Sequence, residues 1–252
     1  MRAPTVTGKV MAILGAFLPG DVRLTLTEIC RRAELPLATG HRLIGELVEG
    51  GFLERLPDGS YRVGMLLWRL GAQAAEPREL RELALPYMED LYATTRENVQ
   101  LAVLHDDRAL YLERLRGPTS VPIVSRVAGE LPLHATGVGK VLLAFAGPET
   151  VERVLAGELT AHAPNTVVDP VRLRAELEEV RRTGVACTQE EMSLGTCSVA
   201  VPVRGAGDRV VAALSLVAWR HNADLRRLVP AVLSAARALS RDLAAVERRG
   251  AP

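Results

Sequence analysis

The stretch TLTEICRRAELPLATGHRLIGELVEGGFLER, from Thr25 to Arg55, decides the fold of the first part of the chain. Its opening TLTE predicts a capping box, because Thr25 can cap a helix while Glu28, three residues later, reaches back to it. Apolar residues recur at helical spacing after Pro36, and proline suits the first turn of a helix. Gly50-Gly51 predicts where this helix ends. We therefore expect two helices joined by a short linker.

The sequence on both sides of this stretch completes a small module. Residues 6–18 place apolar side chains near one helical face, and the Pro-Gly-Asp turn at 19–21 is expected to end that helix. Residues 52–55 and 61–63 have the pattern of two strands joined by the Pro-Asp-Gly turn at 57–59. Three helices followed by a hairpin predict a mainly α winged helix-turn-helix, which is a DNA-binding fold.

The rest of the chain predicts an α+β domain with an antiparallel sheet. A connecting helix from Met65 to about Glu76 should stop at Pro77. The last two apolar strands should lie inside the sheet, because they are apolar on both faces. We expect a winged helix-turn-helix domain at 1–64, a connecting segment at 65–77 and a second domain at 78–252. The elements expected in the second domain are helices at 79–95, 135–147, 169–184 and from about 225 to 246, and strands within 98–117, 120–131, 185–190, 197–204 and 209–219.

Composition excludes several classes of protein. The net charge is +1, with 48% hydrophobic and 24% charged residues, which is typical of a globular protein and says little about partners. The three cysteines form no CxxC pair and have no histidine at ligand spacing, so we expect neither a disulfide scaffold nor a metal site, and no cofactor. The longest uncharged apolar run, Val210–Trp219, is about half of what a membrane helix needs. With no apolar signal segment at the start, a cytoplasmic protein is expected.

Four stretches spread over the chain resemble the IclR family of bacterial transcriptional regulators. They are LTLTEICRRAELPLATGHRLIGELVEGGFLER, YRVG, SRVAGELPLHATGVGKVLLA and EEMSLGTCSVAVPV, the last followed by RVVAALSLVA. The resemblance implies a winged helix-turn-helix that binds operator DNA and a GAF-like domain that binds a small organic acid. The combination QEE…CSVAVPV is more similar to the branch that senses aromatic and protocatechuate-pathway acids than to the glyoxylate-responsive branch.

The helix after Pro36 is where we expect base contacts, although its composition differs from the family pattern. The family usually has Lys and Ser where this chain has Leu37 and Ala38, which can touch only thymine methyl groups. Arg42 can contact a base edge or phosphate alone, and the arginines flanking the wing turn can hold phosphate or simply be solvated. The residues expected to contact DNA are Arg31, Arg32, Leu37, Ala38, Thr39, His41, Arg42, Arg55 and Arg62.

The motif ATGVGK is expected to form the effector pocket, because backbone amides at a glycine-rich helix start suit a carboxylate. The resemblance points to the same amides, those of Gly137 and Val138. Family pocket positions also match Ser198 and Thr188, the latter often acidic in relatives, together with Ser215 and Val217, which share one strand face. Without that acid, and with Val217 where relatives often carry a hydroxyl, we expect a ligand less polar than glyoxylate. Leu131 and Leu133 are expected at the mouth of the pocket. Ser215 can also be an ordinary core serine.

Other functions are compatible with the same residues. His134 beside Ser198 or Ser215 could indicate a hydrolase, but no Gly-x-Ser-x-Gly elbow is present, so no catalytic residue is expected. The main alternative to a regulator is a metabolite-binding module or enzyme whose winged helix serves only dimerisation or protein contacts. A protein–protein adaptor with an apolar patch around Leu37 is a third hypothesis. As a regulator, the chain should act as a homodimer or a dimer of dimers on a pseudo-palindrome.

Overall fold

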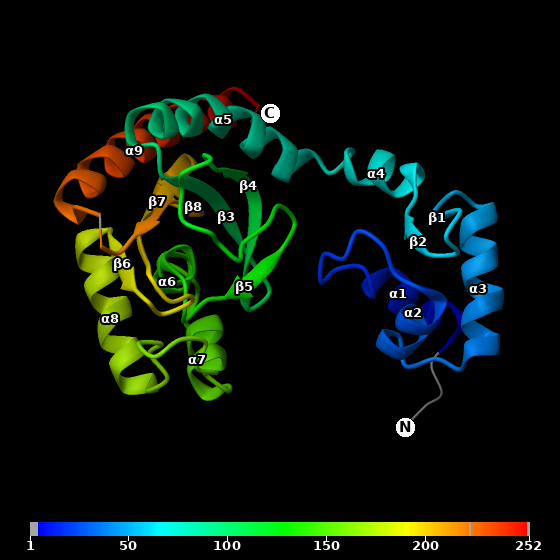
Figure 1. Cartoon of the computed structure of the whole chain (residues 1–252). Coiled ribbons are helices and arrows are strands. Elements are labelled where there is room, and N and C mark those ends of the chain that lie inside the picture. The colour runs from blue at the N-terminus through cyan, green and yellow to red at the C-terminus, as the bar shows by residue number, and fades with distance from the viewer. Residues whose placement is uncertain (1–4, 222, 251–252) are drawn as a thin grey trace. The chain divides into compact units, whose positions relative to one another are not determined.

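The computed structural model describes residues 5–221 and 223–250 (Figure 1). Its contacts divide the chain into two compact units, one ending at Arg78 and the other beginning at Glu79. No helix in the described part of the chain is long and apolar enough to cross a membrane.

The first unit is a winged helix-turn-helix, as the sequence predicts. Its helices pack around a small aliphatic core that includes Ile13, Ile29 and Leu43, all fully buried. The two strands of the wing pair in antiparallel register, with Glu54 opposite Arg62. The elements are α1 (Val6–Gly15), α2 (Leu26–Arg32), α3 (Leu37–Glu49), β1 (Leu53–Arg55), β2 (Tyr61–Val63) and α4 (Met65–Gly71).

A capping box marks the start of α2, and a glycine lets α3 pack closely against it. The capping box at Thr25 is present: its hydroxyl accepts the Glu28 amide at 3.3 Å, and the Glu28 carboxylate accepts the Thr25 amide at 2.8 Å. Gly40 costs α3 about 1 kcal/mol relative to alanine, and the structure supplies the reason for it. A Cβ at Gly40 would stand 2.2 Å from Sγ of Cys30 in α2, so glycine is what lets the two helices approach.

The predicted helix boundary at Pro77 is wrong. α4 already ends at Gly71, and α5 (Ala75–Thr95) begins before the proline rather than at Glu79. Pro77 therefore lies in the first turn of α5, where an amide has no acceptor within the helix and its loss costs no hydrogen bond.

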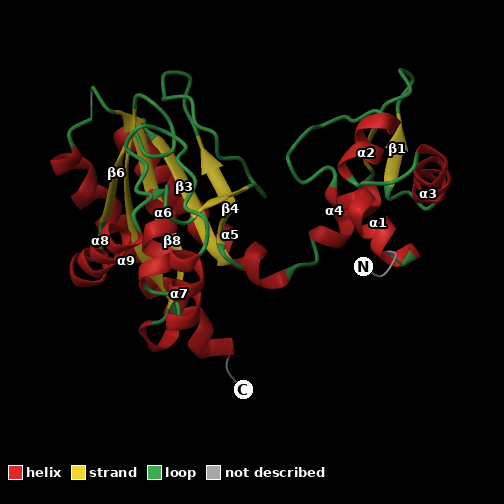
Figure 2. Ribbon diagram, turned by 90° about the horizontal axis from the view of Figure 1, so that it is seen from below, coloured by secondary structure: helices red, strands yellow, loops and turns green. Residues whose placement is uncertain are grey.

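The second unit is built on one antiparallel sheet of order β5-β4-β3-β8-β7-β6 (Figure 2). The two apolar strands predicted to be interior, β7 and β8, do lie inside the sheet. The strands are β3 (Asn98–His105), β4 (Arg108–Leu115), β5 (Glu130–Pro132), β6 (Ala186–Gln189), β7 (Thr196–Arg204) and β8 (Val210–Trp219), and the short helix η1 (Ala206–Asp208) joins the last two.

The strand predicted within residues 120–131 is mostly a loop, and only its end enters β5. Pro122 cannot donate a hydrogen bond to a neighbouring strand. Ala128, with φ of 59°, leaves the extended conformation just before β5. A further helix, α7 (Pro148–Ala156), was not predicted; it begins with proline in its first turn.

Helices cover both faces of this sheet (Figure 1). On one face, α6 (Gly137–Ala144) and α8 (Pro170–Thr183) pack with α7 over small residues such as Ala102, Ala200 and Ala213. On the other face, α5 and α9 (Leu225–Gly250) pack over large aliphatic residues of the same strands. Because the α6 face carries small side chains, the start of α6 can lie close to the sheet, and this closeness positions the cavity described below.

Candidate functional site

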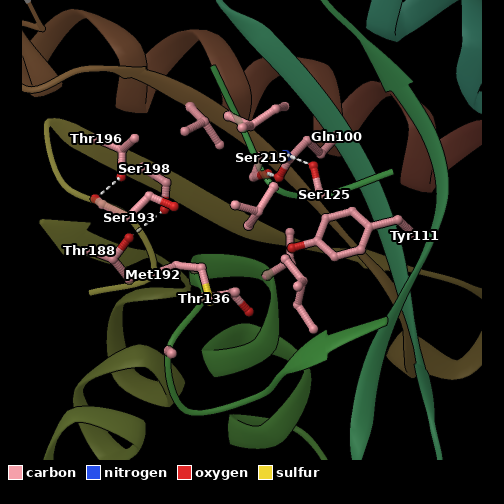
Figure 3. A pocket seen from close by; sticks show the side chains of 17 residues that line it. Gln100, Tyr111, Ser125, Thr136, Thr188, Met192, Ser193, Thr196, Ser198 and Ser215 are labelled. Carbon is pink, nitrogen blue, oxygen red and sulfur yellow. Dashed lines mark hydrogen bonds between the residues drawn. The ribbon is translucent and has the colours of Figure 1, made fainter. Parts of the chain in front are cut away.

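A cavity lies between the N-terminal end of α6 and the central strands (Figure 3). The loop at 123–125 and the loop between β6 and β7 (residues 190–195) contribute further wall residues. The cavity is lined by Gln100, Tyr111, Ile123, Val124, Ser125, Leu131, Ala135, Thr136, Gly137, Val138, Thr188, Met192, Ser193, Thr196, Ser198, Ser215 and Val217.

The polar side chains on the sheet form two hydrogen-bonded groups. In the first, Ser215 Oγ donates to the side-chain oxygen Oε1 of Gln100 at 3.2 Å, and the side-chain nitrogen Nε2 of Gln100 donates to Ser125 Oγ at 2.6 Å. In the second, the hydroxyls of Thr188 and Ser198 lie 2.6 Å apart on neighbouring strands. Hydroxyls can act as donors or acceptors, so both groups can adapt to a bound molecule.

The start of α6 supplies the positive end of the cavity. Thr136 caps the helix, accepting the Gly139 amide at 3.1 Å, and the Lys140 amide bonds to the Thr136 carbonyl at 2.9 Å. The amides of Gly137 and Val138 stand in the first turn, where the helix has no carbonyl to receive them. These amides and the helix dipole favour an anion at this end.

The described side chains that line the cavity carry no formal charge. Burial raises the pKa of the Tyr111 phenol, which keeps the hydroxyl protonated. An anion in the cavity would therefore meet helix amides and hydroxyls rather than an arginine or lysine. Among residues 5–221 and 223–250, no cluster of three or more His, Cys, Asp or Glu could hold a metal ion.

The first unit exposes the start of α3 together with the wing. Leu37 is 53% exposed, and Arg42 forms an ion pair with Glu46 at 2.5 Å on the same helix. In the wing, Arg62 makes two hydrogen bonds to the Glu54 carboxylate, at 2.8 and 2.9 Å. Each of these arginines must leave or share a carboxylate in order to bind a phosphate.

Family profiles cover nearly the whole chain. Residues 6–57 match the IclR helix-turn-helix domain, and residues 72–243 match the bacterial transcriptional regulator IclR C-terminal domain. The chain belongs to the IclR family. It therefore carries the helix-turn-helix and the effector-binding domain of these transcriptional regulators, as the sequence analysis expected.

Individual relatives match most of the chain. The chain is 31% identical to the HTH-type transcriptional regulator XynR of Escherichia coli, covering 86% of each chain. It is 32% identical to the glycerol operon regulatory protein of Streptomyces coelicolor, covering 94% of this chain and 95% of that one. The chain is also similar to an IclR homolog from Microbacterium hydrocarbonoxydans, whose crystal structure was solved in complex with 4-hydroxybenzoate. The two sequences are 39% identical, and the structures match with a TM-score of 0.90 over 96% of this chain and 100% of that one. By their names, the first of these relatives is a transcriptional regulator and the second is an operon regulatory protein.

The structure brings together seven of the eight pocket residues expected from the IclR resemblance. Leu131, Gly137, Val138, Thr188, Ser198, Ser215 and Val217 all line the cavity. Leu133 does not: it is 1% exposed and packs in the core with Val138 and Val141 of α6. Its placement at the mouth is a wrong prediction, because Leu133 lies just after the end of β5, in the turn that leads into α6.

Of the expected DNA-contacting residues, most lie on the surface of the first unit. Arg31, Ala38, His41 and Arg55 are exposed, and Thr39 is half-buried. Arg32 differs, because it donates to the Ala16 carbonyl at 3.0 Å and pairs with Asp21 at 2.7 Å. These bonds tie α2 to the end of α1, so Arg32 has a structural role in this helix-turn-helix.

Several cavity residues were missed. Ser125 lies in the segment taken for a strand, and Met192 and Ser193 lie in the loop of residues 190–195, whose path no local pattern fixes. Gln100 could have been found, since in Asn98–Ala102 polar or small residues alternate with Val99 and Leu101, much as Ala213 and Ser215 alternate with Leu214 and Leu216 in the neighbouring strand β8. His134 is not among the lining residues, and its ring nitrogen Nε2 lies 3.0 Å from the Thr160 carbonyl.

Proposed function

We propose that this IclR-family regulator senses a small aromatic carboxylate and thereby controls its binding to operator DNA. The observation that carries the proposal is a cavity with uncharged side chains that lies against the amide-bearing start of α6. Such a site attracts one negative charge through the helix dipole and offers apolar surface to the rest of the ligand. We infer that the chain acts as a regulator and not as an enzyme, by analogy with its relatives.

We place the carboxylate at the amides of Gly137 and Val138. The ring would then lie against Leu131 and Val217, both of which line the cavity. A polar substituent on the ring would meet the hydrogen-bonded group around Gln100. The structural neighbour complexed with 4-hydroxybenzoate supports this class of ligand.

We further propose that DNA is bound through the start of α3 and the wing. A homodimer or a dimer of dimers would present two α3 helices to a pseudo-palindromic operator. The effector would act by binding one arrangement of the domains better than another, and such couplings typically amount to about 1–3 kcal/mol.

Calorimetric titration with 4-hydroxybenzoate tests the proposal. Its neutral analogue, 4-hydroxybenzamide, should bind at least about tenfold more weakly, because a charge-assisted hydrogen bond contributes about twice as much as a neutral one. Glyoxylate, which leaves the apolar wall unfilled, should also bind weakly. Equal affinity for the acid and the amide would refute a carboxylate site at α6.

Substitution of Ser215, which is 1% exposed and faces the cavity, locates the site. Ser215→Leu should fill the cavity and abolish binding of 4-hydroxybenzoate, whereas Ser215→Ala keeps the space and should retain most of it. DNA binding should survive both changes. Simultaneous loss of ligand and DNA binding would show instead that Ser215 is a core residue.

A further inference from the structure

One of the chain's two lysines is buried beside the cavity without lining it. Lys140 lies in α6, one turn after Gly137, and its side chain is only 2% exposed. Its ammonium group lies 2.5 Å from a carboxylate oxygen of Glu191 and 2.6 Å from one of Glu176. Glu191 is itself buried, whereas the Glu176 side chain is 32% exposed.

The buried partner belongs to the loop of residues 190–195, which joins β6 to β7. The two residues directly after Glu191, Met192 and Ser193, line the cavity. The backbone carbonyl of Glu191 also accepts a hydrogen bond of 2.5 Å from Thr166. The side chain and backbone of Glu191 thus fix one end of this cavity wall.

A buried ion pair is weak evidence for stability, because desolvation of both charges offsets most of their attraction. Burial indeed raises the pKa of Glu191, while Lys140 opposes that shift. A role for this pair is therefore better sought in geometry. The ammonium is a compact point charge that can donate to two carboxylates at once, and here it joins α6 to the loop of residues 190–195 and to α8.

We propose that Lys140 and Glu191 are positioning residues for the effector site. Their ion pair sets the distance between the loop of residues 190–195 and the start of α6, and this distance determines how much room the cavity offers to the ligand. Lys140 belongs to the helix whose amides hold the carboxylate, and Glu191 adjoins the wall residues Met192 and Ser193. The role in ligand affinity rests on the proposed function, whereas the ordering of the loop does not.

The test uses the double variant Lys140→Met/Glu191→Gln in the full chain. Removing both charges avoids the penalty of leaving one of them buried alone, which single variants would incur. The matched control is Arg174→Met/Glu152→Gln, which removes an exposed ion pair of 2.8 Å between α8 and α7. Two readouts are taken well below the melting temperature: amide hydrogen exchange of residues 190–195 without ligand, and calorimetric affinity for 4-hydroxybenzoate.

In the Lys140/Glu191 double variant, we expect faster amide exchange in the loop of residues 190–195 and an affinity for 4-hydroxybenzoate lower by about tenfold, within the range of typical couplings. In the Arg174/Glu152 control, both should stay unchanged. Unchanged exchange in that loop would overturn the proposal, as would unchanged affinity in a chain that binds the probe. If the wild-type chain does not bind 4-hydroxybenzoate, the proposed effector class fails, and the exchange measurement still decides whether the pair positions the loop.

Discussion

Gly40→Ala offers a sharp test of how the helix-turn-helix is assembled. On propensity alone, alanine should stabilise α3 by about 1 kcal/mol. The added Cβ, however, would stand 2.2 Å from Sγ of Cys30, which is buried at 2% exposure and has little room to turn away. Overpacking of this kind costs typically about 1–3 kcal/mol. We therefore expect the clash to outweigh the gain in propensity and to destabilise the first unit by roughly 1 kcal/mol.

The double variant Gly40→Ala/Cys30→Ala separates these two effects. The Cβ of residue 30 lies 3.7 Å from the position that the added methyl group would take, which is ordinary van der Waals contact, so the double variant should regain the lost stability. Hydrogen exchange of peptides from α2 and α3 in the full chain reports this unit separately from the second one. If Gly40→Ala alone proves as stable as the wild type, Cys30 can move, and close packing is not why glycine stands there.

Two further changes probe binding and acid stability. Arg42→Ala should weaken binding to DNA upstream of the chain's own coding sequence and leave the affinity for 4-hydroxybenzoate unchanged. Glu46→Gln removes the ion-pair partner of Arg42 and should not weaken DNA binding. Intact operator specificity in Arg42→Ala would contradict a recognition role for α3. Burial holds the pKa of His134 below its usual value of 6.5. As the pH falls through 6.5, this histidine becomes protonated in the unfolded chain but not in the folded one, so the free energy of unfolding decreases. His134→Gln, which can still donate to the Thr160 carbonyl, should flatten the decline of melting temperature between about pH 7 and pH 5.

The first unit could be predicted almost completely because its signals are local. A capping box, a proline at a helix start and a glycine pair each act within one turn of the chain. Arg42 and Arg62 were correctly expected at the surface, but their ion pairs with Glu46 and Glu54 depend on rotamers that spacing alone does not fix.

The cavity could be predicted only in part, for a physical reason. Gly137, Ser198 and Ser215 lie on regular elements, where periodicity tells which residues share a face. Ser125 and Met192 lie in loops, whose paths follow from long-range packing rather than from local preference. Lys140 was part of a quoted motif, yet nothing near it in sequence reveals a partner 51 residues away.

The cavity exists because the two faces of the same strands carry side chains of different size. On the face toward α5 and α9, β8 presents Leu214 and Leu216, and large aliphatic residues fill the space to the helices. On the face toward α6, it presents Ala213 and Ser215, and a Cβ at Gly137 would already stand 2.6 Å from the hydroxyl of Ser198. The helix start is thus held against the sheet at one point, and the small side chains beyond it leave room for a ligand next to its amides. Close contact and open space therefore have one origin, so we expect a ligand that widens the cavity to displace the start of α6, where we propose that its carboxylate binds.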